Sequence, residues 1–333
     1  MKLRIGILGA GQVGERHAIG FSHTEGVQIV GFADLVEERA ATLANRFGGE
    51  PYTDWRRLID AGVDIVVIGL PHNNHVAPAE AAAAAGVHVL MEKPIATNMA
   101  DAQQLVAACQ LAGVKLTMSF VHRYRDELQR ARAWIDEGMV GVPQVGAESM
   151  NSQRGPHLGR WLTMKDVAGG GVLMYGAIHG IDRFRWLMGS EVVEVTAHTH
   201  QWDAESEVED SAIALFRFAN GATGTLVSYS PIYRAQPAYW ETQIYGTQGM
   251  LRLRVRGWAE VSNNQILKRE DSTTNKGPWG EHYNFVLQAQ EFVAAIREDR
   301  EPAITAEDGL QALRICLAVY ESAELKKTVQ LPV

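Results

Sequence analysis

The chain has 333 residues and a formal net charge of −8, with 31 Lys and Arg against 39 Asp and Glu. At about 150 residues per domain, this length predicts two domains. The acidic balance and the lack of a long basic run argue against a protein that binds duplex DNA or an anionic membrane. Apolar residues make up 46% and charged residues 21%, which excludes a disordered chain.

No stretch approaches the roughly 20 uninterrupted apolar residues of a membrane helix. Lys2 and Arg4 flank a short run that fits a strand better than a signal peptide. Cys109 and Cys316 lie far apart in apolar, helix-like runs, which favours two reduced core residues. These features predict a soluble cytoplasmic protein.

Strands and helices alternate over the first third of the chain. The run VDIVVIGL at 63–70 is apolar throughout rather than alternating, as in a parallel strand covered on both faces. Repeated units of this length predict a doubly wound parallel sheet, an α/β Rossmann domain over residues 1–122. The other strands are expected at 3–8, 27–33, 87–91 and 115–120, and helices at about 13–22, 36–47 and 99–112.

After about residue 123 the pattern changes to an α+β domain, assigned to 123–333. Period-2 alternation on either side of Asn220-Gly221 indicates a β-hairpin, and the sheet is expected to be antiparallel. The expected strands are 192–199, 211–218, 223–228, 242–245 and 250–255, and the expected helices are 171–187, 283–297 and 306–325.

A glycine-rich loop follows the first predicted strand and opens a helix. The spacing of Gly9, Gly11 and Gly14 allows a tight turn, close approach of backbone to a pyrophosphate, and close helix–strand packing. The helix that begins there, through Gln12 and Val13, offers free N–H groups and the positive end of its dipole to the phosphates. The loop therefore predicts a dinucleotide site.

Asp34, at the end of the second strand, indicates which dinucleotide is bound. A carboxylate there accepts hydrogen bonds from the adenosine ribose hydroxyls and repels a 2′-phosphate. Leu35 follows it, with no adjacent cation to neutralise such a phosphate. NAD is therefore predicted, while Arg39, one turn further on, keeps NADP open as an alternative.

Three motifs occur in a recognisable order: Pro71-His72-Asn73-Asn74-His75, Glu92-Lys93-Pro94 and the triple glycine at 169–171. Together they resemble the Gfo/Idh/MocA family, which includes inositol dehydrogenases and glucose–fructose oxidoreductase. The likeness covers nearly the whole chain. It implies an NAD(P)-dependent oxidoreductase acting mainly on sugars and cyclitols. It also implies an open antiparallel sheet in the second domain that often forms the oligomer interface, so a homodimer or homotetramer is expected.

Lys93 is a catalytic residue by this resemblance, beside the nicotinamide and in contact with substrate. The residues themselves agree, because a residue before proline is excluded from the α region and a tight turn can hold the Lys93–Pro94 bond cis. The ammonium would then face the carboxyl ends of the strands, where ligands of this fold bind. There it can stabilise negative charge that develops on oxygen.

The segment GGGVLMYGAIHGIDRFRWL at 169–187 carries the second catalytic element. The family usually has an Asp and a His four residues apart here, one turn apart on one helix face. His179 takes the His position and is the natural general base. Tyr175 replaces the Asp, and is interpreted as a proton relay or substrate contact, as an aromatic wall, or as a loss of the ordinary chemistry. Asp182 either orients His179 or pairs with an arginine of its own helix.

The resemblance extends to further site residues. Glu92 matches a contact to the nicotinamide-side ribose, His122 a crevice-lining position that also contacts substrate, and Tyr283 a position that often points at the sugar. The remaining matches are cofactor contacts at Pro71, His72 and His75, with His72 replacing the commoner Asn, and a loop at Arg160 and Trp161 that reaches cofactor or substrate.

The leading functional hypothesis is hydride transfer between NAD and a hydroxyl carbon of a sugar or cyclitol. The acidic composition makes strongly anionic substrates less favoured than neutral polyols. Two alternatives stay open: a non-catalytic NAD-dependent sensor or regulator, and an NAD-dependent glycosidase of the same family. His198 and His200 alternate along a strand without a completing ligand, so no metal site is expected.

Overall fold

The computed structural model describes residues 2–152, 159–230, 238–273 and 280–332. It divides into two compact units, the first made of residues 1–121 and 275–310 and the second of residues 122–274 and 311–333. The division expected after residue 122 is close to the first break, but the return of residues 275–310 to the first unit was not expected. Helix α9 (Tyr283–Arg297) explains that return. Its Ala289, Phe292 and Val293 join the apolar core of the first unit.

The first unit is a doubly wound parallel sheet with strand order β3-β2-β1-β4-β5-β6, which confirms the predicted Rossmann fold. Its strands are β1 (Leu3–Leu8), β2 (Val27–Ala33), β3 (Glu50–Tyr52), β4 (Ile65–Ile68), β5 (His88–Met91) and β6 (Leu116–Met118). Its helices include α1 (Gln12–Ser22), α2 (Glu37–Phe47), α3 (Trp55–Asp60), α4 (Val76–Ala84) and α5 (Met99–Ala112). Strand β3 was not predicted, because its three residues, EPY, contain a proline and no apolar run.

The strand order of this sheet determines where a ligand can bind. Strand β4 is buried on both faces, as its unbroken apolar run predicts. Strand β1 lies between β2 and β4, so successive strands are added on opposite sides of it. Open α/β sheets bind ligands outside the carboxyl ends of the strands at such a reversal. In this chain Gly9 and Gly69 stand there, one residue beyond Leu8 and Ile68.

The second unit contains a nine-stranded sheet of order β14-β13-β12-β11-β7-β10-β9-β8-β15. It is antiparallel except between β7 and β10, which run parallel, so the expected antiparallel sheet is in fact mixed. Strand β7 was missed because its sequence, PQVGAESMN, breaks the apolar alternation. The strands are β7 (Pro143–Asn151), β8 (Val192–His200), β9 (Ser211–Phe218), β10 (Thr223–Tyr229), β11 (Tyr239–Gly246), β12 (Gly249–Arg254), β13 (Trp258–Asn263), β14 (Leu267–Asp271) and β15 (Val329–Gln330).

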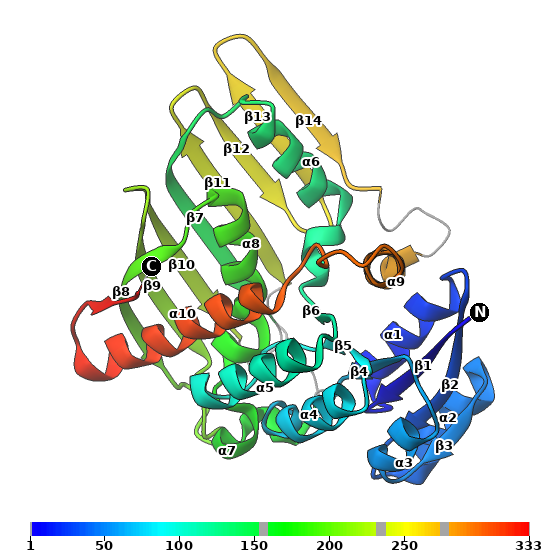
Figure 1. Cartoon of the computed structure of the whole chain (residues 1–333). Coiled ribbons are helices and arrows are strands. Elements are labelled where there is room, and N and C mark those ends of the chain that lie inside the picture. Colours follow the sequence, from blue (N-terminus) through cyan, green and yellow to red (C-terminus); the bar gives the residue numbers. More distant parts are fainter. Residues whose placement is uncertain (1, 153–158, 231–237, 274–279, 333) are drawn as a thin grey trace. The chain divides into compact units, whose positions relative to one another are not determined.

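Helices cover one face of this sheet. Figure 1 shows α6 (Asp126–Asp136) lying across β12 and β13, and α8 (Ile178–Met188) lying across β7 and β11. Helix α8 approaches closely because Phe184 packs on two glycines, where added Cβ atoms would lie 2.4 Å (Gly146) and 2.5 Å (Gly224) from its ring. On the opposite face, Ile213 and Leu215 of β9 are 57% and 53% exposed. Oligomerisation through that face stays a prediction.

Two further expectations concern the whole chain. Cys109 and Cys316 are free and buried, as predicted for core thiols. In the ranges that the structure describes, no helix combines the length and apolarity needed to cross a membrane.

We predict that Gly224→Val destabilises the protein by about 1–3 kcal/mol, because the side chain would enter the space of the Phe184 ring. The measurement is the free energy of unfolding in urea. Thr225→Val, on the next and exposed position of β10, is the matched control and should change stability by less than about 0.5 kcal/mol. Equal effects at the two positions would contradict the packing described here.

Candidate active site

The three glycines of the nucleotide loop have three different structural roles. Gly9 has φ +95° and lies so close to the neighbouring strand end that a Cβ would sit 2.3 Å from the Gly69 carbonyl oxygen. At Gly14 a Cβ would sit 1.9 Å from the Gly9 oxygen. At Gly11, in contrast, an added Cβ would meet nothing within 4 Å. Gly9 and Gly14 therefore close the turn, and Gly11 leaves open space at the start of α1.

Helix α1 begins directly after this open space. Its N-cap is Gly11, which has no side chain that could accept a hydrogen bond from the first turn. The first N–H groups of a helix have no intrahelical acceptor, and they carry the positive end of its dipole. Gln12 and Val13 supply such groups here. The loop therefore fits a dinucleotide pyrophosphate, as the sequence predicts.

Asp34 links the end of β2 to the glycine loop. Its Oδ2 accepts a hydrogen bond from the Ala10 backbone N–H at 2.9 Å, and its Oδ1 accepts one from Val36 N–H, also at 2.9 Å. Each oxygen keeps acceptor capacity for a ribose hydroxyl. The adjacent Leu35 is 92% exposed and offers no cation to a 2′-phosphate, and Arg39 is exposed on the first turn of α2. These residues fit NAD.

A buried hydrogen-bonded pair that the sequence did not reveal lies beneath the Glu92-Lys93-Pro94 turn. His17 of α1 approaches Glu92, with Nε2 2.8 Å from Oε1. Burial by itself raises the pKa of Glu92, but the hydrogen bond and charge of His17, with the charge of Lys93, outweigh it and hold the pKa at about 2. Glu92 is therefore ionised at neutral pH. Its other oxygen accepts the Lys93 backbone N–H at 3.2 Å.

Lys93 occupies the turn as predicted, and its bond to Pro94 is cis. The side chain is half-buried. Burial lowers the pKa of Lys93, the charge of Glu92 opposes that shift, and the charge of Arg16 adds to it. An ammonium group with depressed pKa beside a fixed carboxylate can donate a hydrogen bond to a reacting oxygen and stabilise charge on it.

His75 differs from the expectation of a direct cofactor contact. It is fully buried, with Nδ1 3.0 Å from the Pro94 oxygen and Nε2 3.0 Å from the Leu70 oxygen. Burial lowers its pKa, and the backbone contacts oppose that shift. His75 is thus a positioning residue that holds the Lys93 turn. His72, in the short turn after Pro71, is 4% exposed and packs 6.1 Å from the His75 ring.

In the second unit, the triple glycine is explained by a carboxylate that the sequence analysis missed. Glu209 accepts hydrogen bonds from the N–H groups of Gly171 (2.7 Å) and Leu173 (3.0 Å). Its Oε1 also accepts one from the hydroxyl of Tyr320 at 2.9 Å. A Cβ at Gly171 would lie 1.7 Å from the Glu209 backbone oxygen, and one at Gly170 would lie 2.0 Å from the Tyr320 hydroxyl. Only glycine lets these two segments meet.

Tyr175 and His179 follow from this anchored start. A π-helical turn at Leu173–Ala177 leads directly into α8, so the predicted regular helix is locally wider here. Such turns occur often at functional sites. Tyr175 and His179 are both half-buried. The His179 ring stacks on that of His122, with centroids 4.4 Å apart and an interplanar angle of 18°.

His122 is held in one protonation state by an arginine. Nη1 of Arg183 lies 3.0 Å from His122 Nδ1 and must donate, so Nδ1 is the acceptor and the proton of the neutral ring is on Nε2. Burial lowers the pKa of His122 well below its usual value, and the charges of His179 and Arg183 add to this. Arg183 in turn is paired with the fully buried Glu148, which also accepts the Thr242 hydroxyl at 2.6 Å.

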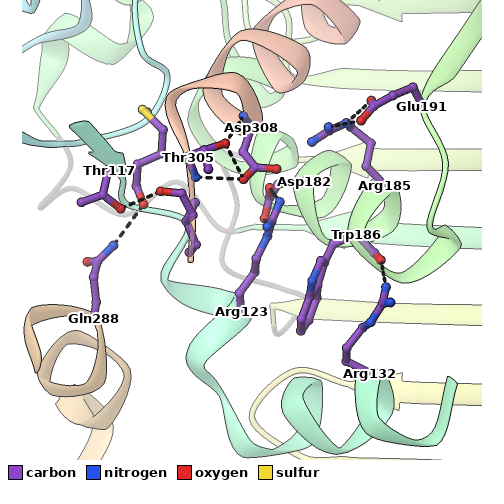
Figure 2. A network of polar contacts seen from close by, with 12 residues as sticks. Thr117, Arg123, Arg132, Asp182, Arg185, Trp186, Glu191, Gln288, Thr305 and Asp308 are labelled. Atoms are coloured by element: carbon purple, nitrogen blue, oxygen red, sulfur yellow. Dashed lines mark hydrogen bonds and ion pairs between the residues drawn. The ribbon is translucent and has the colours of Figure 1, made fainter. Parts of the chain in front are cut away.

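Asp182 has a partner that the sequence did not suggest. Its buried carboxylate accepts hydrogen bonds from Nε and Nη2 of Arg123, as Figure 2 shows. The guanidinium of Arg123 also lies 5.5 Å from the Trp186 ring, and Arg132 donates to the Trp186 carbonyl at 2.6 Å. This group of side chains fixes the segment that carries His122 against α8.

The remaining predicted residues are distributed between the two units. Tyr283, the first residue of α9, belongs to the first unit, which also contains Lys93 and the nucleotide loop. His122, Tyr175 and His179 belong to the second unit. Arg160 and Trp161 form a short 3-10 turn in the second unit, and the indole packs on Gly159. Ligand contacts by Arg160, Trp161 and Tyr283 stay predictions. No group of three potential metal ligands occurs among the described residues.

Comparison with known proteins identifies the family of this chain. Residues 3–120 match the family model for the NAD-binding Rossmann fold of the Gfo/Idh/MocA oxidoreductases, and residues 132–331 match that for their C-terminal alpha/beta domain. The chain is 28% identical to 1,5-anhydro-D-fructose reductase of Ensifer adhaerens, over 96% of each chain. It is 26% identical to myo-inositol 2-dehydrogenase of Thermotoga maritima, over 99% of this chain and 98% of that one.

Solved structures give the same result. Levoglucosan dehydrogenase, in a complex with NADH and levoglucosan, superposes with a TM-score of 0.92 and 25% identity, over 100% of both chains. The two family models together span most of the sequence, and the site residues present fit the cofactor of that family. The chain belongs to the Gfo/Idh/MocA family and is an NAD-binding oxidoreductase.

Proposed function

We propose that this protein is an NAD-dependent dehydrogenase or reductase that transfers hydride between nicotinamide and a hydroxyl carbon of a sugar or cyclitol. The observation that carries the proposal is Lys93, which follows β5 at the carboxyl ends of the parallel strands and whose ammonium group is attracted by the charge of the ionised Glu92. The names of its relatives, which are reductases and dehydrogenases of sugars and inositol, support the substrate class.

In the oxidation direction, NAD held by the glycine loop and Asp34 would supply the hydride acceptor. His179 accepts the hydroxyl proton on an imidazole nitrogen, and the Lys93 ammonium donates a hydrogen bond to the oxygen that becomes the carbonyl. Stacking on His122 fixes the plane of the His179 ring. Because His122 is itself held neutral by the hydrogen bond from Arg183, it places no second positive charge beside the base as that base becomes protonated.

Tyr175 is assigned to substrate contact or proton relay. It stands one turn before His179, is half-buried, and lies within the π-helical turn. A phenol can donate and accept a hydrogen bond at once, so it can link a substrate hydroxyl to the base. The carboxylate usual in the family would add a negative charge at this point, which tyrosine does not.

The test is a spectrophotometric assay of NADH and NADPH formation, with each oxidised cofactor crossed with cyclitols, aldoses and glycosides. We expect NADH from sugars or cyclitols of one stereochemistry, and little NADPH because of Asp34. Cofactor binding without any turnover would contradict the proposal and indicate a sensor. Cleavage of a glycoside without net NADH would contradict it and indicate an NAD-dependent glycosidase.

We predict that Lys93→Ala lowers kcat with the substrate found in that assay by about 100-fold or more, because a donor to the reacting oxygen is lost. NADH affinity, measured by fluorescence titration, should change by only a few-fold. Lys268→Ala removes an exposed lysine from β14 and should leave both values unchanged. Undiminished turnover in Lys93→Ala would contradict the mechanism.

We predict a pH-dependent contribution of Glu92 to stability. Its pKa in the folded protein, about 2, lies below the usual 4.5, so the stabilisation is complete above pH 4.5 and is lost as the pH falls toward 2. At neutral pH Glu92→Gln should cost about 3 kcal/mol in the free energy of unfolding. The measurement is urea unfolding at several pH values.

The difference between the native protein and Glu92→Gln should shrink steadily below pH 4.5. Glu37→Gln, at an exposed position in the first turn of α2, is the control and should show little difference at any pH. A cost at Glu92 that stayed constant from neutral to acidic pH would mean that the carboxylate is not ionised through its pairing with His17.

A further inference from the structure

The stacked rings of His122 and His179 turn the same edge toward the protein interior. Nδ1 of His122 lies 3.0 Å from Nη1 of Arg183, and Nδ1 of His179 is also a buried atom. The ring planes differ by 18° and their centroids lie 4.4 Å apart, all within the second unit. Because the planes are nearly parallel and both Nδ1 atoms are buried, both rings present Nε2 at the opposite, outer edge.

The guanidinium of Arg183 has one nitrogen left for His122. Its Nε donates to the Thr242 hydroxyl at 3.0 Å and lies 3.4 Å from Oε2 of Glu148, and its Nη2 donates to Oε1 of Glu148. Nη1 donates to Nδ1 of His122. Since an arginine can only donate, the proton of the neutral His122 ring is on Nε2.

The orientation of Arg183 is fixed by its surroundings. Arg183 and Glu148 are fully buried side chains, and Glu148 also accepts the Thr242 hydroxyl at 2.6 Å. At Gly180 an added Cβ would lie 3.1 Å from Oε1 of Glu148, so glycine leaves room for that carboxylate. Turning the His122 ring over would leave Nη1 of Arg183 buried without an acceptor, which costs free energy. The geometry therefore holds His122 as a donor at Nε2.

The Nε2–H group of His122 has no acceptor among the residues that the structure describes. It is also not one of their fully buried polar atoms without a partner, so this atom is accessible from outside. The residue is 6% exposed, and its ring contacts the rings of His179 and Trp240. This accessible donor, on an otherwise enclosed ring beside the proposed base, is placed to contact a bound ligand.

The groups around His122 keep its ring neutral. Burial lowers its pKa well below the usual value, and four neighbouring groups add to this effect. They are His179 and Arg183 of α8, Arg125 at the start of α6, and Arg256 in the turn between β12 and β13. The ring therefore keeps a single donor, Nε2–H, and does not share the role of base with His179.

We propose that Nε2–H of His122 donates a hydrogen bond to a second oxygen of the sugar or cyclitol whose reacting hydroxyl contacts His179, and that Arg183 is the positioning residue for this donor. The inference rests on the proposed dehydrogenase function and adds a requirement for its substrate. Besides the reacting hydroxyl, the substrate carries an oxygen that can accept a hydrogen bond from the neighbouring ring edge. A substrate without that oxygen leaves the donor unmatched and binds less tightly.

The first test determines the tautomer without any ligand, so it does not depend on the proposed function. It uses ¹⁵N-histidine-labelled protein and two-bond ¹H–¹⁵N correlation spectra, in which the His122 signals are identified by their loss in His122→Phe. We expect a neutral ring protonated on Nε2 from about pH 8 to about pH 5, the range in which an ordinary histidine becomes charged. A proton on Nδ1, or a ring that becomes charged in this range, would overturn the inference.

The double variant Glu148→Met with Arg183→Met tests the positioning role. It replaces the buried charged pair by apolar side chains, a change that proteins often tolerate, whereas Arg183→Met alone leaves Glu148 buried and unpaired. We expect the His122 ring of the double variant to populate both neutral tautomers. A ring that stays protonated on Nε2 alone would show that Arg183 does not select the donor.

The second test measures the hydrogen bond to the ligand by isothermal titration calorimetry. The full-length protein saturated with NADH is titrated with D-glucose, D-galactose, D-xylose and myo-inositol, and then with the monodeoxy analogues of the tightest of the four. We expect one analogue to bind about 10-fold less tightly than its parent, because Nε2–H of His122 then lacks its acceptor. In His122→Phe, which keeps a ring without a donor, that difference should disappear while the differences at other positions remain.

A purely structural role of His122 would give a different result, since it would weaken the binding of every analogue by the same factor. His122→Gln has an amide that can accept from Arg183 and donate to the ligand, so it should retain the preference for the parent. His198→Phe removes an exposed histidine of β8 in the same unit and is the matched control. Its affinities should equal those of the native protein.

The possible outcomes separate this inference from the proposed function. Differences among the analogues that stay unchanged in His122→Phe, or no binding of any of the four probes to the native protein, would overturn the hydrogen bond even if NADH forms from a sugar. A difference that depends on His122, without NADH formation from any sugar, would support the hydrogen bond and overturn the dehydrogenase.

Discussion

A carboxylate that accepts backbone N–H groups holds each of three segments: the nucleotide loop, the Lys93 turn and the start of the turn that carries Tyr175. Asp34 accepts a hydrogen bond from the Ala10 N–H in the glycine loop, and Glu92 accepts one from the Lys93 N–H. Glu209 accepts two hydrogen bonds from backbone N–H groups at the start of the turn that carries Tyr175. Such hydrogen bonds are stronger than neutral ones and orient the backbone rather than only the side chain. The positions of Lys93 and Tyr175 depend on them, because each bond fixes the backbone of the segment that carries the reactive side chain.

Local sequence patterns predicted the features that depend on neighbouring residues. The spacing of Gly9, Gly11 and Gly14 after an apolar strand was enough to predict the nucleotide loop, since all three glycines lie in one short segment of the sequence. The unbroken apolar run of β4 predicted a strand covered on both faces. Lys93 was found from its proline and from a family resemblance that the comparisons confirm. Its ligand contacts remain predictions.

Features that depend on contacts between distant segments could not be predicted in this way. His17 is 75 residues from Glu92, and Glu209 is 38 residues from Gly171, so no local spacing joins them. The same holds for Arg123 and Asp182, which are 59 residues apart. His75 was predicted to contact the cofactor because the sequence does not show that its side chain is buried. The parallel pairing of β7 with β10 was not predicted because the sequence of β7 lacks a regular apolar alternation.

The central claim is that hydride passes directly from a hydroxyl-bearing carbon of a sugar or cyclitol to NAD. The most direct measurement supplies NAD together with a pool of sugars and cyclitols deuterated at their carbon-bound positions, and determines the deuterium content of the recovered NADH by mass spectrometry. The account predicts one deuterium in each NADH formed, and NADH formation about 100-fold slower or more when Lys93→Ala replaces the native protein. NADH without deuterium, or no NADH from a protein that binds the cofactor, would contradict it.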